Sequence, residues 1–125
     1  MSDATKLYRH IHPAWIRNNR VTSQAFCPTA KDEQRLSVYD GDQISAKNAF
    51  KHYSRGHESA GVLAVTVGEC SALGLTVVPE PSLFPEHLII DFSPFGRSQS
   101  KRIAKKLAEL ARARGWQYAP SGTGT

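Results

Sequence analysis

Hydrophobic positions along the chain switch between a period of two and a helical period, and this switching predicts the order of the elements. Apolar and polar residues alternate over residues 6–12, which is typical of a half-exposed strand. Residues 21–26 and 36–39 predict two further strands. The nearly continuous apolar run of residues 60–67 predicts a central strand that is covered on both faces, and residues 87–92 predict the last strand.

Three helices are expected among these strands. Ser45 is a suitable N-cap for the first helix, whose apolar positions are three or four residues apart. Thr66 and Glu69 match a capping box for a second, short helix. The longest helix is expected over residues 98–114, and Gly115 is a typical residue just beyond a helix C-terminus.

The order β-β-β-α-β-α-β-α favours an α+β domain. We expect a mixed sheet of about five strands with the helices on one face. Residues 1–118 are predicted to form one domain and residues 119–125 a disordered tail. Three prolines within residues 77–87 predict an extended loop before the last strand.

Composition is that of an ordinary globular protein. Of the 125 residues, 40% are hydrophobic and 22% are charged. No apolar run approaches the length of a membrane span, and the first residues lack the apolar segment of a secretory signal. Cys27 and Cys70 lack the spacing of a metal site and are expected to be reduced thiols. We therefore expect a cytoplasmic protein without membrane partners.

Basic charge is concentrated in the last part of the chain. Residues 97–125 contain seven basic residues and one acidic residue, a net charge of +6. Basic side chains on one helix can neutralise phosphates and release counterions. The candidate nucleic-acid-binding residues are Lys101, Arg102, Lys105, Lys106 and Arg112. The leading hypothesis is a small binding domain that engages nucleic acid or an acidic protein through this helix.

The first strand carries a second candidate site. Strand alternation places His10 and His12 on the same face, roughly 7 Å apart. Such a pair could bind a metal if His87 or Asp91 supplied a third ligand, or it could perform acid–base chemistry. A polar, solvent-facing side of an edge strand would show the same pattern.

This second hypothesis is an enzyme that acts on a nucleotide or on RNA. Its candidate catalytic residues are Arg9, His10, His12, Ser23 and Tyr39. The sequence identifies no metal ligand set, no cofactor and no oligomeric state.

Asp40, Gly41 and Asp42 also resemble the start of a calcium loop. Counting from Asp40, however, the later ligand and glycine positions are occupied by Ile44, Ser45 and Lys51, so these residues do not match a calcium-binding loop. A turn that leads into the first helix accounts for these residues.

Two family resemblances apply to short parts of the chain. "LYRH" (Leu7–His10) and "TSQAF" (Thr22–Phe26) are similar to the opening of ADP-ribosyltransferase-like folds. This resemblance implies a nucleotide-handling or nuclease-like toxin, with Glu86 as the nearest match to a late catalytic glutamate. "LSVYDGD" (residues 36–42) resembles a motif shared by small bacterial proteins, which implies a bacterial origin.

The proline-rich loop supports a third hypothesis. It places Leu83 and Phe84 between prolines, as a docking loop for a protein partner would. An immunity-type or other interaction protein is therefore a further alternative.

Overall fold

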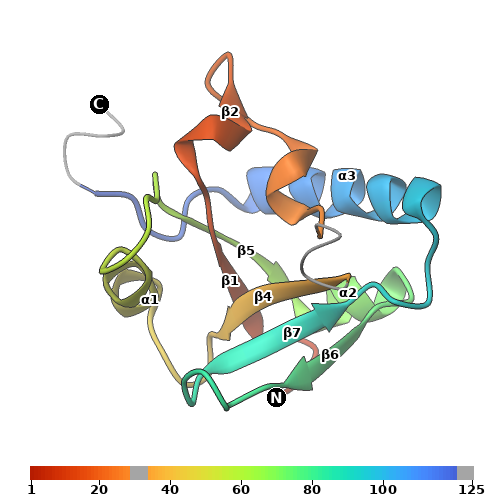
Figure 1. Cartoon of the computed structure of the whole chain (residues 1–125), viewed down its shortest axis with the longest axis horizontal. Helices are drawn as coiled ribbons and strands as arrows, with labels where there is room; N and C mark the ends of the chain where they lie inside the picture. Colours follow the sequence, from red (N-terminus) through yellow and green to blue (C-terminus); the bar gives the residue numbers. More distant parts are fainter. Residues whose placement is uncertain (29–33, 121–125) are drawn as a thin grey trace.

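The computed structural model describes residues 1–28 and 34–120 and confirms the predicted α+β class. Its main sheet has five strands in the order β5-β1-β4-β7-β6 (Figure 1). The strands are β1 (Lys6–His10), β4 (Arg35–Asp40), β5 (Val62–Thr66), β6 (Thr76–Pro79) and β7 (His87–Asp91). Every pairing is antiparallel, so the mixed sheet that we expected is wrong. The connections that contain helices join β4 to β5 and β5 to β6; these strands run parallel to one another but are not neighbours in the sheet.

A short hairpin follows β1. A 3-10 turn, η1 (Pro13–Trp15), leads into β2 (Ile16–Arg17) and β3 (Arg20–Val21). Asn18 and Asn19 join these strands with φ angles of 53° and 62°, the left-handed values that a tight hairpin turn requires.

The strand expected over residues 21–26 is wrong beyond Val21. The chain enters a second 3-10 turn there, η2 (Ser23–Phe26). The Thr22 hydroxyl donates to the Trp15 carbonyl at 2.8 Å, and this bond fixes the change of direction. As a result, Phe26 is fully buried in the core and does not extend a strand.

Strand β5 is an edge strand and not the central strand that its apolar sequence predicts. Its side chains are nevertheless buried from Val62 to Val65, and the C-terminal part of the chain covers the backbone at this edge. The Val62 N–H donates to the Tyr118 carbonyl at 2.8 Å, and the Gln117 N–H donates to the Val62 carbonyl at 2.8 Å. Further along the edge, Nη1 of Arg114 donates to the Ala64 carbonyl at 2.9 Å and covers this part of β5.

Part of the expected proline-rich loop is also a strand. Residues Thr76–Pro79 form β6 and pair with β7. Because β6 is the opposite edge of the sheet, Pro79 can end the strand without removing an interior hydrogen bond.

The three helices are α1 (Ala46–Tyr53), α2 (Val67–Ala72) and α3 (Arg97–Arg114). Their predicted caps are confirmed: the Ser45 side chain accepts from the Asn48 N–H, and Thr66 and Glu69 form the capping box. Gly115 has a φ of 89°, and its N–H donates to the Ala111 carbonyl at 3.0 Å, which ends α3.

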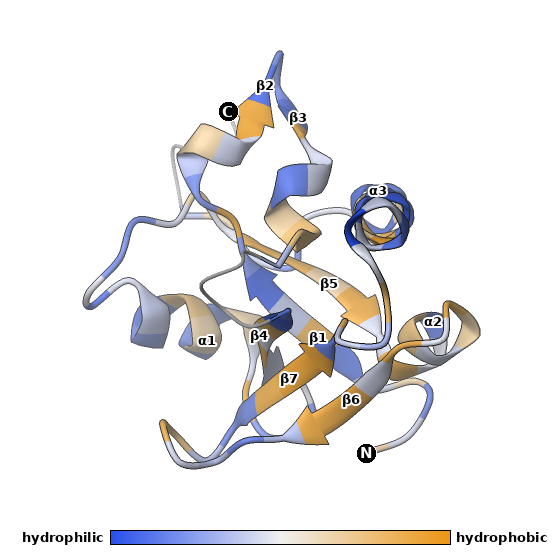
Figure 2. Cartoon of the chain, turned by 45° about the vertical axis from the view of Figure 1, so that its right-hand side comes forward, coloured by the Kyte–Doolittle hydropathy of each residue, from blue (hydrophilic) through white to orange (hydrophobic). Residues whose placement is uncertain are grey.

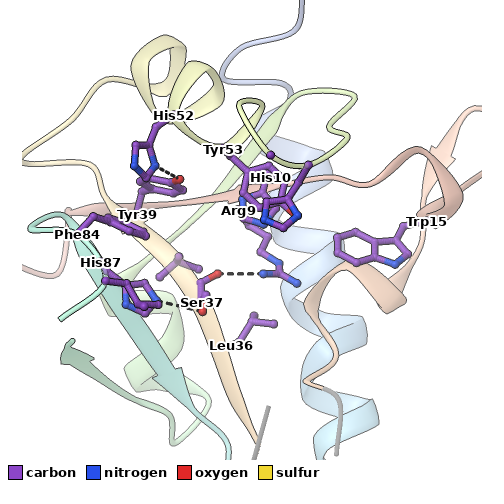
Figure 3. A pocket seen from close by; sticks show the side chains of 14 residues that line it. Arg9, His10, Trp15, Leu36, Ser37, Tyr39, His52, Tyr53, Phe84 and His87 are labelled. Atoms are coloured by element: carbon purple, nitrogen blue, oxygen red, sulfur yellow. Dashed lines mark hydrogen bonds between the residues drawn. The ribbon is translucent and has the colours of Figure 1, made fainter. Parts of the chain in front are cut away.

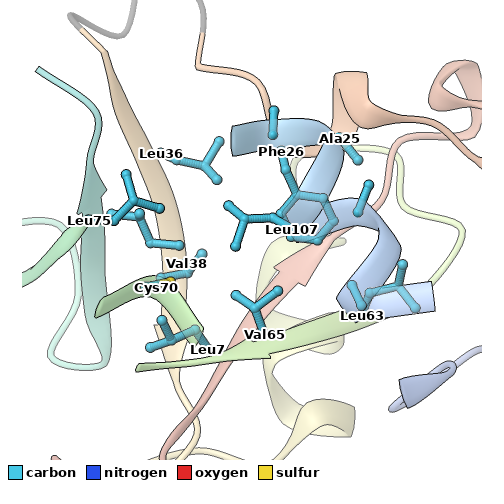
Figure 4. Packing of buried hydrophobic residues seen from close by; sticks show 14 of the residues in the cluster. Leu7, Ala25, Phe26, Leu36, Val38, Leu63, Val65, Cys70, Leu75 and Leu107 are labelled. Carbon is cyan, nitrogen blue, oxygen red and sulfur yellow. The ribbon is translucent and has the colours of Figure 1, made fainter. Parts of the chain in front are cut away.

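The helices lie on both faces of the sheet, which corrects the expected one-sided arrangement. α3 packs against the face that carries Leu7 and Val65, and its buried Leu107 meets Phe26 in the core (Figure 4). Tyr8 and Tyr39 are paired on the opposite face, and α1 covers this face beside His10 (Figure 1).

No helix in the described parts of the chain is long and apolar enough to cross a membrane. The tail predicted over residues 119–125 lies outside the described residues from position 121 onward.

Candidate active site between the two halves of the sheet

The sheet splits between β1 and β4. These strands pair only at Leu7–Asp40 and Tyr8–Tyr39. Beyond this point β1 continues along β5, whereas β4 continues along β7. The backbone of β4 therefore loses its partner on one side as the two strands diverge.

Arg9 bridges this split. Its Nη1 donates to the Ser37 carbonyl of β4 at 3.0 Å, and its Nε donates to the Ala25 carbonyl at 2.8 Å. The guanidinium also lies 5.2 Å from the centroid of the Trp15 ring, within the range of a cation–π contact. At Ser37, Arg9 thus supplies a hydrogen bond that a neighbouring strand would have made.

A cleft of about 580 Å³ opens at the split (Figure 3). Strands β1, β4 and β7, helix α1, η1 and the β6–β7 loop all contribute side chains. The lining includes Arg9, His10, Trp15, Ser37, Tyr39, His52, Tyr53, His57, Leu83, Phe84 and His87. Its size is typical of sites for small molecules.

Four of the five histidines of the chain line this cleft, namely His10, His52, His57 and His87. The fifth, His12, packs 5.9 Å from the ring of Trp15, which is itself a lining residue. None of the described lining residues is an acid. The walls therefore combine proton-transfer groups and aromatic rings without a carboxylate.

His87 makes two hydrogen bonds through opposite ring nitrogens. Its Nδ1 lies 2.8 Å from the Glu80 carbonyl oxygen, and its Nε2 lies 3.0 Å from the Ser37 hydroxyl (Figure 3). The His87 side chain is buried, whereas Ser37 is exposed to the cleft. A hydroxyl, an imidazole and a carbonyl are thus connected in one chain.

Tyr39 forms a second hydroxyl–imidazole pair. Its hydroxyl lies 2.7 Å from Nδ1 of His52. Burial, with the nearby Tyr53 and Glu86, raises the pKa of Tyr39 to about 12, so its phenol stays protonated at neutral pH. The Tyr39 ring stacks on Phe84, with ring centroids 4.8 Å apart.

His10 is held between the sheet and α1. Its ring stacks on Tyr53, which in turn stacks on His57. Burial, with the positive charges of Arg9 and His57, lowers the pKa of His10 to about 2. Its Nδ1 is buried and has no hydrogen-bond partner among the described residues. His10 is thus a neutral wall of the cleft.

The predicted catalytic residues are only partly brought together. Arg9, His10 and Tyr39 line the cleft, but Ser23 lies in η2 and is not among the lining residues. The expected His10–His12 pair is wrong, because β1 ends at His10 and the Nδ1 of His12 caps η1 by accepting from the Ala14 N–H at 2.9 Å.

The metal site considered for this pair is also not formed. Within residues 1–28 and 34–120, no group of three histidine, cysteine or acidic side chains is arranged to hold a metal ion.

The sequence does not identify Ser37 or His52 as candidate site residues. Ser37 reads as a polar position between two buried strand residues, and His52 as a surface position of a helix. Phe84 was assigned to partner docking, but its ring packs 4.8 Å from both His52 and His87, while Leu83 remains 74% exposed.

The basic face of α3 is a separate surface. Lys101, Arg102, Lys105 and Lys106 are all exposed, and Figure 2 looks along α3 and shows its hydrophilic rim. Arg112 differs from these four residues, because its Nη1 donates to the Val21 carbonyl at 2.8 Å and holds the hairpin against the helix.

Comparison with known proteins finds no matching family model, no similar curated protein and no similar solved structure.

Proposed function

We propose that the protein binds a nucleotide, either free or at the end of an RNA strand, in the cleft between β1 and β4. The observation that carries this proposal is the convergence of four of the five histidines with aromatic rings and Arg9 in one cleft. Five separate segments of the chain contribute to this lining.

The aromatic side chains match the base of a nucleotide. Trp15, Tyr53 and Phe84 are half-buried and line the cleft, so part of each side chain is accessible from it. Stacking of a base on such a ring contributes about 1–3 kcal/mol. The neighbouring imidazoles and the Tyr39 hydroxyl can form hydrogen bonds with base edges and with the sugar.

The charges of the cleft match the phosphate. Arg9 carries a permanent positive charge at its floor, and no described lining residue carries a negative charge. The cleft therefore favours an anionic ligand over a cationic one.

Trp15 provides a direct test. The chain has two tryptophans, and Trp116→Phe leaves Trp15 as the single fluorescent reporter in the cleft. Titration with each of the four ribonucleoside 5′-monophosphates should give a saturable change in its fluorescence. Phe84→Ala in this background should weaken binding about 5- to 150-fold, the equivalent of one lost stacking contact.

Val78→Ala is the matched control. Val78 is an exposed hydrophobic residue of β6 that does not line the cleft, and its substitution should leave the affinity unchanged. Absence of a saturable signal up to about 1 mM nucleotide, or equal affinity in Phe84→Ala, contradicts the proposal.

Binding of a nucleic-acid backbone by α3 is the second candidate function. It is supported by four exposed basic side chains in two adjacent rows of one helix, one of which, Lys106, lies 4.0 Å from the carboxylate of Glu109. A backbone that follows these rows would release counterions, and its affinity would fall steeply with salt.

Two matched double variants test this candidate. Lys101→Gln with Lys105→Gln removes two charges from α3, whereas Lys47→Gln with Lys51→Gln removes two charges at the same spacing from α1. Fluorescence anisotropy with labelled single-stranded RNA should show a decrease of about 1.4 in the slope of log K against log salt for the α3 pair. If the two double variants had equal effects, RNA binding would depend only on the net charge of the protein, and the specific role of α3 would be refuted.

A further inference from the structure

We propose that Ser37 is a nucleophile and His87 its general base, in an enzyme that transfers the phosphoryl group of a nucleoside phosphodiester. This inference rests on the nucleotide binding proposed above and adds a reaction at the same site.

The hydrogen bonds of His87 fix its protonation. The Glu80 carbonyl can only accept, so Nδ1 of His87 carries the proton in the 2.8 Å contact. In the neutral ring, Nε2 then has the lone pair, and the Ser37 hydroxyl donates to it over 3.0 Å. A nucleophile bonded to a base, with the base oriented by a third group, is the arrangement that activates serine in enzymes.

Burial and exposure are divided between the two residues as this chemistry requires. His87 is 2% exposed and is held by β7 and the Glu80 carbonyl, so its ring cannot turn away. Ser37 is exposed and lines the cleft, where a bound ligand could reach its hydroxyl.

The surroundings of Ser37 favour a phosphate ester. Arg9 is bonded to the backbone carbonyl of Ser37, so a guanidinium charge is held at the same residue as the reacting hydroxyl. Such a fixed charge stabilises the additional negative charge that develops on phosphoryl oxygens during transfer. Phe84 contacts the His87 ring at 4.8 Å and can position a base next to the reacting group.

The reaction balances with water as the only co-substrate. Ser37 Oγ attacks phosphorus, an O–P bond forms, and the bond from phosphorus to the leaving nucleoside oxygen breaks. His87 Nε2 takes the Ser37 proton and passes it to that leaving oxygen. Water then gives a proton to His87 and attacks the phosphoserine diester, and His87 returns the proton to Ser37 Oγ as it leaves.

Labelling of the unmodified chain is the first test. An alkyl fluorophosphonate reacts with activated serines, and mass spectrometry should locate its adduct on Ser37. The exposed Ser98 of α3 is the control, because Ser98→Ala should retain the adduct whereas Ser37→Ala should lose it. Absence of an adduct on Ser37 overturns the proposal without the need for any variant.

His87→Gln tests the base. Glutamine can keep a hydrogen bond to Ser37 but cannot take its proton, so the labelling rate should fall about 100- to 10,000-fold. Turnover of bis(4-nitrophenyl) phosphate should fall by the same factor. Equal labelling of Ser37 in His87→Gln would overturn the role of His87.

The nucleotide titration of the Trp116→Phe background separates the two proposals. Nucleotide binding without an adduct on Ser37 refutes the catalytic role and leaves nucleotide binding intact. An adduct on Ser37 without nucleotide binding refutes the nucleoside substrate.

Discussion

His10→Phe should remove the acid sensitivity that the buried His10 imposes on the fold. The His10 side chain is 8% exposed, and burial with the charges of Arg9 and His57 lowers its pKa from 6.5 to about 2. In the unfolded chain the imidazole takes up a proton near pH 6.5, whereas the folded protein keeps it neutral down to about pH 2. The unfolded state therefore binds more protons between these values, and stability falls as the pH is lowered.

The magnitude follows from this difference in pKa. One proton bound only by the unfolded state lowers the free energy of unfolding by about 1.4 kcal/mol per pH unit well below pH 6.5. Between pH 7 and pH 5 the loss from His10 alone is about 2 kcal/mol. Phenylalanine keeps a ring against Tyr53 and loses no hydrogen bond at Nδ1, because that atom has no partner in the part of the chain that the structure describes.

Urea denaturation at pH 7 and at pH 5 measures the effect. The other four histidines are present in both proteins, so their contributions cancel in the comparison. His10→Phe should be more stable relative to the unmodified protein at pH 5 than at pH 7, by about 2 kcal/mol. The same stability difference at the two pH values would show that folded His10 takes up a proton in this range and would refute the reasoning.

Three further predictions concern the framework of the fold. Gly41→Ala places a Cβ 2.5 Å from the backbone carbonyl oxygen of Lys6 in β1 and should lower the free energy of unfolding, measured in urea, by about 1–3 kcal/mol. Gly56→Ala should have little effect, because its Cβ would meet no atom of the described residues within 4 Å. Arg114→Met leaves the carboxylate of Glu69 without the two 2.9 Å hydrogen bonds of that guanidinium and should lower the free energy of unfolding by about 1–3 kcal/mol. An unchanged free energy of unfolding would show that the pair does not contribute to stability. Burial, with the charge of Glu69, raises the pKa of Cys70 to about 12, so a thiol reagent should label Cys70 only after unfolding. Labelling of Cys70 in the folded protein as fast as that of the half-buried Cys27 would contradict its burial.

Features fixed by neighbouring residues could be predicted from the sequence. Ser45 and Thr66 begin their helices as expected, and Gly115 ends α3, because a cap depends on residues within one turn. Asp40 likewise forms the expected turn, with its Oδ1 accepting from the Asp42 N–H at 2.9 Å.

Strand order depends on distant contacts and could not be predicted in this way. The apolar run of β5 is typical of a central strand, but β5 lies at an edge that Arg114 and Tyr118 cover from the other end of the chain. Alternation also failed at His12, because proline and the η1 turn follow it at once.

The candidate site depends on this same topology. Ser37 and His87 are 50 residues apart and meet because β4 pairs with β7. His52 reaches Tyr39 only because α1 packs on the face opposite α3. No periodicity in the sequence predicts these contacts between distant residues. Arg9, His10 and Tyr39 could be predicted as site residues because each is a polar or aromatic position in an evident strand.

The position of β1 inside the sheet also determines how the chain can fold. β1 is synthesised before both of its neighbours in the sheet, β4 and β5, and Lys6 pairs with Thr66. The hydrophobic core on one face of β1 is completed by α3, the last of the described helices. Early collapse of the N-terminal part alone would leave β1 without partners, so most of the chain must be synthesised before the sheet can form. Such non-local pairing predicts folding in about milliseconds to seconds rather than microseconds.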